Sequence, residues 1–303
     1  MAAHRKVNVG WIAKAVAFNI FNRIPYGENI YFLFQSRFTK TYPRNLIPTI
    51  DSGKVQIKHA QEMIDIFHDL GDLNLLEFGA GWDLYANLIY YCYGLNRQVA
   101  VDVRRWAKAS TINAVIDHLQ TDPPPGHVRT PASPVREEHL EEDLKSFYGI
   151  SYIAPTEGEK TGLAPNSVDV ITTTSVFEHI PLKSISKLLS ECRRIIKSDG
   201  YMIHTVDYSD HYAHADPDIT EYNYLRFSEK SWRIFNPGIH YQNRLRTIDY
   251  ENLFESAKFR TLRCIQWKGR PSELERISVH SEFSRYSRDE LLTIGAMFVA
   301  TPS

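Results

Sequence analysis

The sequence predicts an α/β protein with a mostly parallel, seven-stranded sheet and helices on both faces. Short apolar runs that suit strands alternate with segments of helical period along most of the chain. This alternation is typical of parallel strands joined by crossover helices, which cover the sheet on both sides. The predicted strands are residues 73–78, 98–103, 150–154, 168–172, 201–206, 259–267 and 292–300.

The helices follow from apolar spacing and from the residues that stop them. Apolar side chains recur with a helical period over residues 55–70, and Gly71 then ends the pattern. The proline-rich stretch 121–134 is expected to be a loop, because proline cannot continue a central element. Further helices are predicted over residues 84–93, 106–119, 182–196 and 250–257.

Two segments do not fit the alternation. Residues 208–246 are rich in tyrosine, histidine and arginine without a clear period, so we expect a cap insertion after the fifth strand. This insertion would cover the carboxyl edge of the sheet, where open α/β sheets bind ligands. Residues 1–54 are predicted to form a helical N-terminal extension, with a helix over 11–21 buried between other elements, and residues 55–303 the main domain.

The amino-acid composition limits the classes of binding partner that we expect. Lysine and arginine number 35 against 36 acidic residues, and the net charge of −1 gives no reason to expect a nucleic-acid partner. A small or neutral substrate fits better. The apolar stretch 11–21 is too short to span a bilayer, so we expect no integral membrane segment. The three cysteines lack paired spacing, which favours reduced thiols in a cytoplasmic protein.

A glycine turn follows the first predicted strand of the main domain. Glu77 ends the strand, and Gly79 and Gly81 let the backbone turn sharply beside a ligand. The third glycine of a dinucleotide-binding motif is absent, and Asp83 stands at the entry to the following helix, where a carboxylate would repel a pyrophosphate, which argues against NAD. Asp102 closes the next strand and can accept hydrogen bonds from ribose hydroxyls.

With these motifs the chain resembles class I S-adenosylmethionine-dependent methyltransferases. The resemblance rests on residues 77–81 (Glu-Phe-Gly-Ala-Gly), 101–103, 167–171 and 175–180. It implies a Rossmann-like fold, with S-adenosylmethionine as the cofactor. The nucleotide-binding core would cover roughly residues 55–207. Parts of the insertion look like bacterial methyltransferases of surface-polysaccharide or natural-product pathways.

The resemblance also implies roles for individual residues. The first motif would contact the methionine part of the donor, Asp102 the ribose, and Glu157 the adenine amino group, where the family often has an aspartate. His179 is interpreted as a structural residue in preference to a catalytic one. The donor-binding residues implied in this way are Glu77, Phe78, Gly79, Ala80, Gly81, Asp102, Val103, Glu157, Thr174 and Ser175.

The acceptor side is expected just beyond the fifth strand. For a hydroxyl acceptor, the protein must align the oxygen and remove its proton. We therefore predict an O-methyltransferase in which His211, oriented by Asp207 or Asp210, is the base. A metal site that also uses His204 and His214 is less favoured, because alternate strand residues point in opposite directions, and no metal is expected.

The composition of the insertion suits a sugar or a secondary metabolite as acceptor. Aromatic rings can stack on a substrate ring, and guanidinium groups can bind hydroxyl or carboxylate groups, although core packing explains the same residues nearly as well. N-methylation and a non-catalytic S-adenosylmethionine-binding scaffold are the alternatives. The residues concerned are Tyr222, Tyr224, Phe227, Trp232, Phe235 and Tyr241, with Arg226, Arg233, Arg244 and Arg246.

Overall fold

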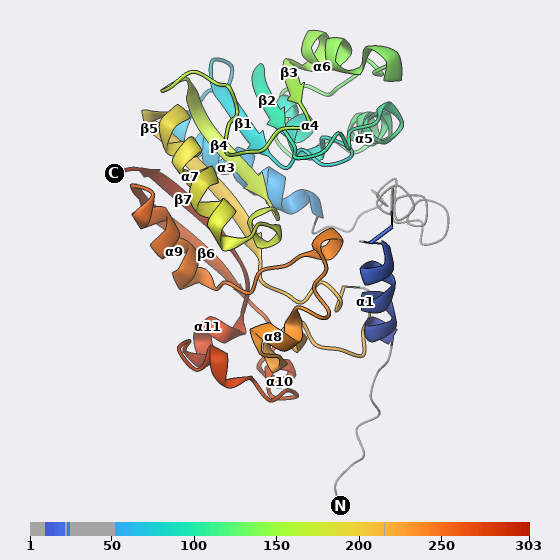
Figure 1. The fold of residues 1–303 in the computed structure, drawn as a ribbon. Helices are drawn as coiled ribbons and strands as arrows, with labels where there is room; N and C mark the ends of the chain where they lie inside the picture. The colour runs from blue at the N-terminus through green and yellow to red at the C-terminus, as the bar shows by residue number, and fades with distance from the viewer. Residues whose placement is uncertain (1–9, 22, 25–51, 215) are drawn as a thin grey trace, which may run out of the picture.

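A single mixed sheet forms the centre of the molecule (Figure 1). The computed structural model describes residues 10–21, 23–24, 52–214 and 216–303. The seven strands are β1 (Asn74–Phe78), β2 (Arg97–Val101), β3 (Ile150–Ile153), β4 (Val168–Thr174), β5 (Ile196–Asp207), β6 (Phe259–Lys268) and β7 (Thr293–Pro302).

The strand order is β3-β2-β1-β4-β5-β7-β6. The first five strands are parallel, and β7 runs antiparallel to both β5 and β6. The predicted mostly parallel sheet is therefore confirmed. The direction of winding reverses between β1 and β4, and open sheets bind ligands at the carboxyl ends of the strands at such a switch point.

Helices cover both faces of the sheet. The larger helices of the main domain are α3 (Ser52–Phe67), α4 (Tyr85–Cys92), α5 (Ala109–Thr121), α6 (Leu140–Tyr148), α7 (Leu182–Ile195) and α9 (Thr247–Ser256). Several boundaries differ from the prediction, and one helix was missed: α3 spans residues 52–67 instead of 55–70, β5 begins at residue 196 instead of 201, and α9 begins at residue 247 instead of 250. Helix α5 begins at Ala109, three residues later than expected from residue 106. Helix α6 was not predicted, because its buried Leu140, Leu144 and Tyr148 are few among charged residues.

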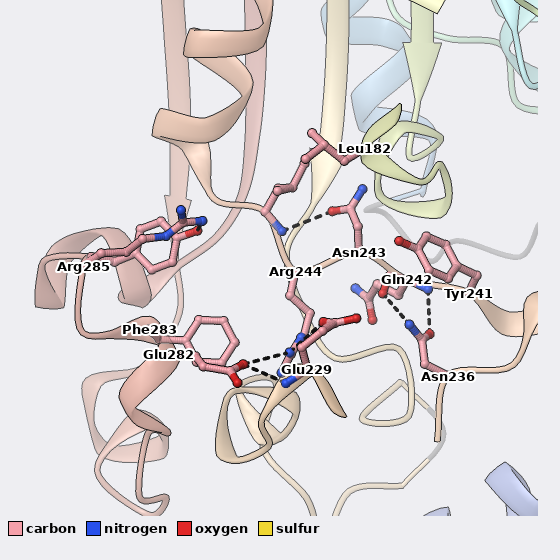
Figure 2. A pocket seen from close by; sticks show the side chains of 12 residues that line it. Leu182, Glu229, Asn236, Tyr241, Gln242, Asn243, Arg244, Glu282, Phe283 and Arg285 are labelled. Atoms are coloured by element: carbon pink, nitrogen blue, oxygen red, sulfur yellow. Dashed lines mark hydrogen bonds and ion pairs between the residues drawn. The ribbon is translucent and has the colours of Figure 1, made fainter. Parts of the chain in front are cut away.

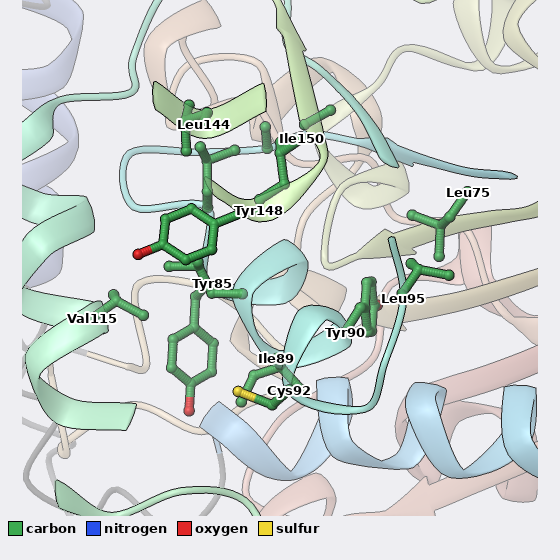
Figure 3. Close-up of a cluster of buried hydrophobic side chains, with 14 of the residues drawn as sticks. Leu75, Tyr85, Ile89, Tyr90, Cys92, Leu95, Val115, Leu144, Tyr148 and Ile150 are labelled. Carbon is green, nitrogen blue, oxygen red and sulfur yellow. The ribbon is translucent and has the colours of Figure 1, made fainter. Parts of the chain in front are cut away.

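Two apolar cores lie on opposite sides of the sheet. Residues of α3, α4, α5 and α6 pack together in one core, and residues of α7 and α9 in the other. Figure 3 shows the first core, in which Tyr90 of α4 lies near Leu75 of β1. Helix α7 buries Ile185, Leu188 and Cys192, whose spacing gives it one apolar face toward the sheet.

A third cluster forms a cap on the molecule. It joins aromatic residues of the insertion with the segment between β6 and β7 and with α1 (Gly10–Phe21). The sequence placed the cap in residues 208–246 alone, whereas residues between β6 and β7 also build it. The remaining short helices are α8 (Glu229–Trp232), α10 (Pro271–Leu274), α11 (Arg288–Leu292), η2 (Glu137–His139), η3 (Phe177–His179), η4 (Asn223–Arg226), η5 (Gly238–His240) and η6 (Ser281–Phe283).

Helix α1 packs on the cap through one side only. Trp11 and Phe18 are buried, and the Trp11 ring centroid lies 4.9 Å from that of Phe235. Val16 and Ile20 are 54% and 55% exposed on the other side. The helix over residues 11–21 is therefore present as predicted, and within the described part of the chain only one of its faces packs on other elements. Among the described residues, none of the helices combines the length and the apolarity needed to cross a bilayer.

A buried polar layer lies between β1, β4 and the helices that cover them. The Glu77 side chain is 1% exposed and accepts a hydrogen bond from the Thr172 hydroxyl. Nearby, His59 of α3 contacts the Tyr90 hydroxyl at 3.1 Å and Thr205 Oγ1 at 2.8 Å. Burial raises the pKa of Glu77 to about 8 and lowers the pKa of His59 to about 3. Both side chains are therefore mainly uncharged at neutral pH.

Replacement of Glu77 by glutamine should make the fold less sensitive to alkaline pH. Because Glu77 has a higher pKa in the folded state than in the unfolded chain, its contribution to stability falls as the pH rises from about 4.5 to about 8. Glutamine does not titrate, so the difference in unfolding free energy between variant and wild type should shift in favour of Glu77→Gln by on the order of 4 kcal/mol over this range.

Urea unfolding at pH 5 and pH 8 measures this difference. The exposed Glu255→Gln on α9 is the matched control, and it should follow the wild-type pH profile. Parallel profiles for Glu77→Gln and the wild type would contradict a neutral, buried Glu77.

Candidate active site

The turn after β1 brings backbone close to the strand ends on either side. Gly79 and Gly81 have φ angles of +77° and +69°, which side chains other than glycine rarely tolerate. The N–H groups of Gly79 and Ala80 donate to the Val101 carbonyl at 2.9 and 3.2 Å. A Cβ on Gly79 would lie 2.4 Å from Val176 Cγ2. Glycine is thus required at residue 79 by both conformation and space.

Asp102 holds this turn from the end of β2. Its Oδ2 accepts the Gly81 N–H at 3.0 Å, and its Oδ1 accepts the Arg104 N–H at 3.1 Å. Burial raises the pKa of Asp102, while these backbone donors oppose the shift. The Asp102 carboxylate therefore faces the glycine turn as the sequence predicted, and each oxygen keeps a lone pair for a further donor.

A pocket of about 880 Å³ opens where β1, β2 and β4 end. All the predicted donor-site residues except Glu77 and Ala80 line it, and both of these are buried. Glu77 points into the polar layer between sheet and helices. The predicted residues that line the pocket are Phe78, Gly79, Gly81, Asp102, Val103, Glu157, Thr174 and Ser175.

Several lining residues were not predicted. Trp82 and Trp106 lie with their ring centroids 4.2 Å apart, so the two rings form an aromatic wall. Lys187 of α7 pairs with Glu159 at 2.9 Å, which joins two sides of the pocket. Trp82, inside the glycine motif, was the one signal that could have indicated an aromatic wall.

Asp83 does not act as the sequence suggested. The Asp83 side chain is 2% exposed, and its Oδ1 accepts the Tyr85 N–H at 3.2 Å. It is absent from the residues that line the pocket, within the part of the chain that the structure describes. Asp83 therefore accepts a backbone N–H at the start of α4 and contributes no surface to the pocket.

Histidine side chains from two segments gather beside the pocket. We call His179, His211 and His214, with Glu178 and Asp207, the histidine cluster. The His211 ring centroid lies 4.9 Å from that of His179 and 5.2 Å from that of His214. Asp207 Oδ2 is 3.6 Å from His211 Nε2 and 3.5 Å from His214 Nε2. His179 also lines the pocket, so the cluster and the pocket share a residue.

Burial controls the charge of the cluster. It lowers the pKa of His211 well below the usual value, and the neighbouring histidines lower it further. Burial also lowers the pKa of His179. Glu178 is 1% exposed, and its pKa is well above the usual value because of burial and the nearby Asp207. The imidazole of His211 is therefore neutral near pH 7.

Two of the predicted acceptor-side residues lie elsewhere. Asp210 is fully buried; its Oδ1 accepts the Tyr212 N–H at 2.8 Å and its Oδ2 the Asn223 amide at 2.9 Å. It therefore orders the cap, and Asp207 is the carboxylate that approaches His211. His204 contacts Thr173 Oγ1 at 3.0 Å in the sheet core, so it does not join the cluster. His179, which was interpreted from the sequence as a structural residue, belongs to the histidine cluster.

The cap holds the turn that carries Glu178 and His179. Asn243 donates its side-chain amide to the carbonyls of Phe177 and Ile180 at 2.8 and 3.0 Å, and its N–H to that of Glu178 at 2.6 Å. His179 Nδ1 donates to the Tyr241 carbonyl at 2.8 Å. The insertion thus fixes both the backbone and the ring of this turn.

Arg244 and Arg246 of the insertion donate hydrogen bonds to other residues of the cap. A smaller pocket of about 340 Å³ lies on the cap (Figure 2), and Arg244 lines it. Its Nη1 donates to the carbonyls of Tyr224 and Phe227 at 3.1 and 2.6 Å. Arg246 is fully buried, and its Nη1 donates to the Tyr224 hydroxyl at 2.6 Å. The expectation that these two arginines bind an acceptor is replaced by a packing role.

Comparison with known proteins identifies a family to which the chain is similar. A family model described as "Methyltransferase domain" matches residues 40–262. No curated protein matches the chain.

Solved structures with a similar arrangement share little sequence with this chain. The YcgJ protein from Bacillus subtilis is 14% identical, with 82% of this chain and 98% of that chain covered and a TM-score of 0.44. Geranyl diphosphate C-methyltransferase from Streptomyces coelicolor is 12% identical, with 82% and 80% covered and a TM-score of 0.45. Magnesium protoporphyrin IX methyltransferase from Synechocystis is also 12% identical, with 83% of each chain covered and a TM-score of 0.45.

The family match spans the glycine turn, Asp102 and the histidine cluster, and the sheet has the strand order and the pocket that a nucleotide-like donor requires. The chain belongs to the methyltransferase-domain family and is an S-adenosylmethionine-dependent methyltransferase.

Proposed function

We propose that this methyltransferase methylates an oxygen atom of a small-molecule acceptor that lies against the histidine cluster. The observation that carries the proposal is the position of His179, which lines the donor pocket and also contacts the His211 ring. An acceptor atom at this junction would be close to the donor and to a neutral imidazole at the same time. Proximity of this kind supplies much of the rate enhancement in group transfer.

The donor roles follow from the shape and polarity of the pocket. The backbone of Gly79 and Gly81 would lie along the methionine part of S-adenosylmethionine, and the absence of a Cβ on Gly81 leaves room there, because only the Gly79 carbonyl oxygen, at 4.0 Å, lies near that position. The remaining lone pairs of Asp102 would accept hydrogen bonds from the ribose hydroxyls. Glu157, exposed at the rim, would accept from the adenine amino group. Phe78, Val103, Thr174 and Ser175 would close around the donor.

On the acceptor side, His211 would accept the hydroxyl proton. S-adenosylmethionine supplies a methyl carbon whose bond to sulfur breaks, with the electron pair kept on sulfur, as the acceptor oxygen bonds to the carbon. The lowered pKa of His211 keeps its imidazole neutral near pH 7, as a proton acceptor must be. Asp207, whose Oδ1 accepts the Ser209 N–H and hydroxyl at 2.7 and 2.6 Å, would stabilise the imidazolium.

This arrangement favours oxygen over nitrogen as the methylated atom. A neutral amine carries its own lone pair and needs mainly to be positioned, whereas a hydroxyl gains most from a neighbouring base. The histidine cluster supplies such a base beside the donor pocket. The acceptor class is therefore a hydroxyl-bearing small molecule, of which a sugar or a secondary metabolite is an example.

Asp102→Asn should weaken donor binding by about 10- to 100-fold, because hydrogen bonds to a carboxylate contribute about 1.5–3 kcal/mol. Asparagine keeps the size of the side chain and one oxygen acceptor for the Gly81 N–H. Calorimetric titration with S-adenosylmethionine measures the change. Asp117→Asn, an exposed site on α5, is the matched control and should bind as the wild type does. Equal affinities for wild type and Asp102→Asn would remove Asp102 from the donor site.

His211→Ala should lose turnover while it retains donor affinity, since His211 acts on the acceptor. A positioned base contributes about 10²- to 10⁴-fold, so we expect turnover to fall by that factor. The release of S-adenosylhomocysteine with a panel of hydroxyl-bearing and amine-bearing acceptors gives the rate, and mass spectrometry gives the methylated atom. His139→Ala, exposed on η2, is the control. Unchanged turnover in His211→Ala, or methylation only of amines, would refute the proposal.

A further inference from the structure

Three ligating side chains meet where the donor pocket joins the cap. One ligand atom each from Glu178, His179 and His211 lies within 4.8 Å of the other two. Glu178 and His179 come from η3 after β4, and His211 from the segment after β5. Two imidazole nitrogens and one carboxylate oxygen are a ligand set that zinc enzymes use when a coordination position stays open. The ligand set therefore suits a transition-metal ion.

Glu178 gives a second and independent indication. Its side chain is 1% exposed, and within the described ranges 10–21, 23–24, 52–214 and 216–303 no side chain donates a hydrogen bond to its carboxylate oxygens, which lie near the backbone N–H groups of Glu178 and Asp207 only. A buried carboxylate without a charged partner is unfavourable, so it either keeps its proton or is compensated by a cation. In those same ranges the ion pairs of lysine and arginine involve other carboxylates. A bound cation would supply the missing partner.

The rings and charges around Glu178 are already arranged for an ion. Because His179 Nδ1 donates to the Tyr241 carbonyl at 2.8 Å, its Nε2 carries the lone pair that a metal requires. A carbonyl behind a ligating histidine is the usual outer partner in metal sites. Asp207 Oδ2, 3.6 Å from His211 Nε2, adds a second negative charge beside the cluster. Together with Glu178 it would balance the charge of a divalent ion.

We propose that Glu178, His179 and His211 bind one divalent transition-metal ion, with Zn²⁺ as the best fit. Ligand atoms lie about 2.0–2.2 Å from zinc, so in tetrahedral coordination two of them on one ion are roughly 3.3–3.6 Å apart. The three ligand atoms lie within 4.8 Å of one another, so the side chains would have to approach further to bind the ion. Magnesium and calcium fit poorly, since they prefer sets made of oxygen ligands.

The ion would deepen the proposed function, and this part of the inference rests on it. A zinc ion here would polarise the acceptor hydroxyl, as it lowers the pKa of a bound water. In the zinc-loaded enzyme Asp207 would then take the place of His211 as the proton acceptor, because coordination occupies the one basic lone pair of the neutral His211 imidazole. The acceptor of a zinc-loaded enzyme is accordingly a hydroxyl compound, and one with a second oxygen nearby would bind best.

Zinc titration of the whole, untagged protein after chelator treatment tests the site. We expect one zinc ion per chain in the wild type and no calorimetric signal with Mg²⁺. Glu178→Gln, His179→Ala and His211→Ala should each weaken zinc binding at least 10- to 100-fold, because changes even to outer partners of metal ligands have effects of about this size. His139→Ala is the matched control: it removes an exposed histidine that lies 3.2 Å from Glu142, and it should bind zinc as the wild type does.

Absence of zinc binding in the wild type, or equal affinity in all three variants, would overturn the proposal. Circular dichroism and titration with S-adenosylmethionine show whether each variant is folded. If the variants do not fold, Co²⁺ added to the wild type decides: visible absorption bands from nitrogen and oxygen ligation support the site, and their absence refutes it. Zinc binding without methyl transfer would refute the proposed function alone, whereas methyl transfer by a protein that binds no zinc would refute the ion site alone.

Discussion

The hydrogen bond from the Gly81 N–H to Asp102 is the contact on which the rest of the site depends. It ties the turn after β1 to the end of β2 at 3.0 Å, while Gly79 lies against Val176 at the end of β4. Three parallel strands therefore end around one opening, and the backbone there cannot relax to fill it. The hydrogen-bonded strands hold their carboxyl ends in fixed positions, and the glycine turn leaves the pocket open between them.

Much of the sheet could be predicted because its strands carry a local signal. Compact apolar runs between turn residues identify a buried strand without any knowledge of its neighbours. Helix α6 was missed because its three buried side chains stand among acidic residues, so its apolar face is narrow. The second part of the cap, between β6 and β7, was missed for another reason. Its apolar residues pack on aromatic residues distant in sequence, and only the folded chain brings them together.

The donor site was predictable to the extent that backbone geometry defines it. Gly79, Gly81 and Asp102 lie at strand ends, where the direction of a side chain follows from its place in the strand. Glu77 was predicted to contact the donor, yet its side chain points toward Thr172 in the buried polar layer. Asp210 was predicted beside His211, but it bonds Tyr212 and Asn223. In irregular segments, the sequence proximity of a carboxylate to a histidine does not determine which residue the carboxylate contacts.

The histidine cluster is formed by contacts between segments that are distant in sequence. Its composition could therefore not be predicted from the sequence alone. Asn243 and the Tyr241 carbonyl, both in the insertion, fix the turn that carries Glu178 and His179. His211 arrives from the start of the same insertion and meets that turn. Cap packing therefore fixes the positions of His211 and His179, and His179 also lines the pocket at the strand ends. Under the proposed function, acceptor chemistry would depend on cap packing, whereas donor binding would depend mainly on the sheet.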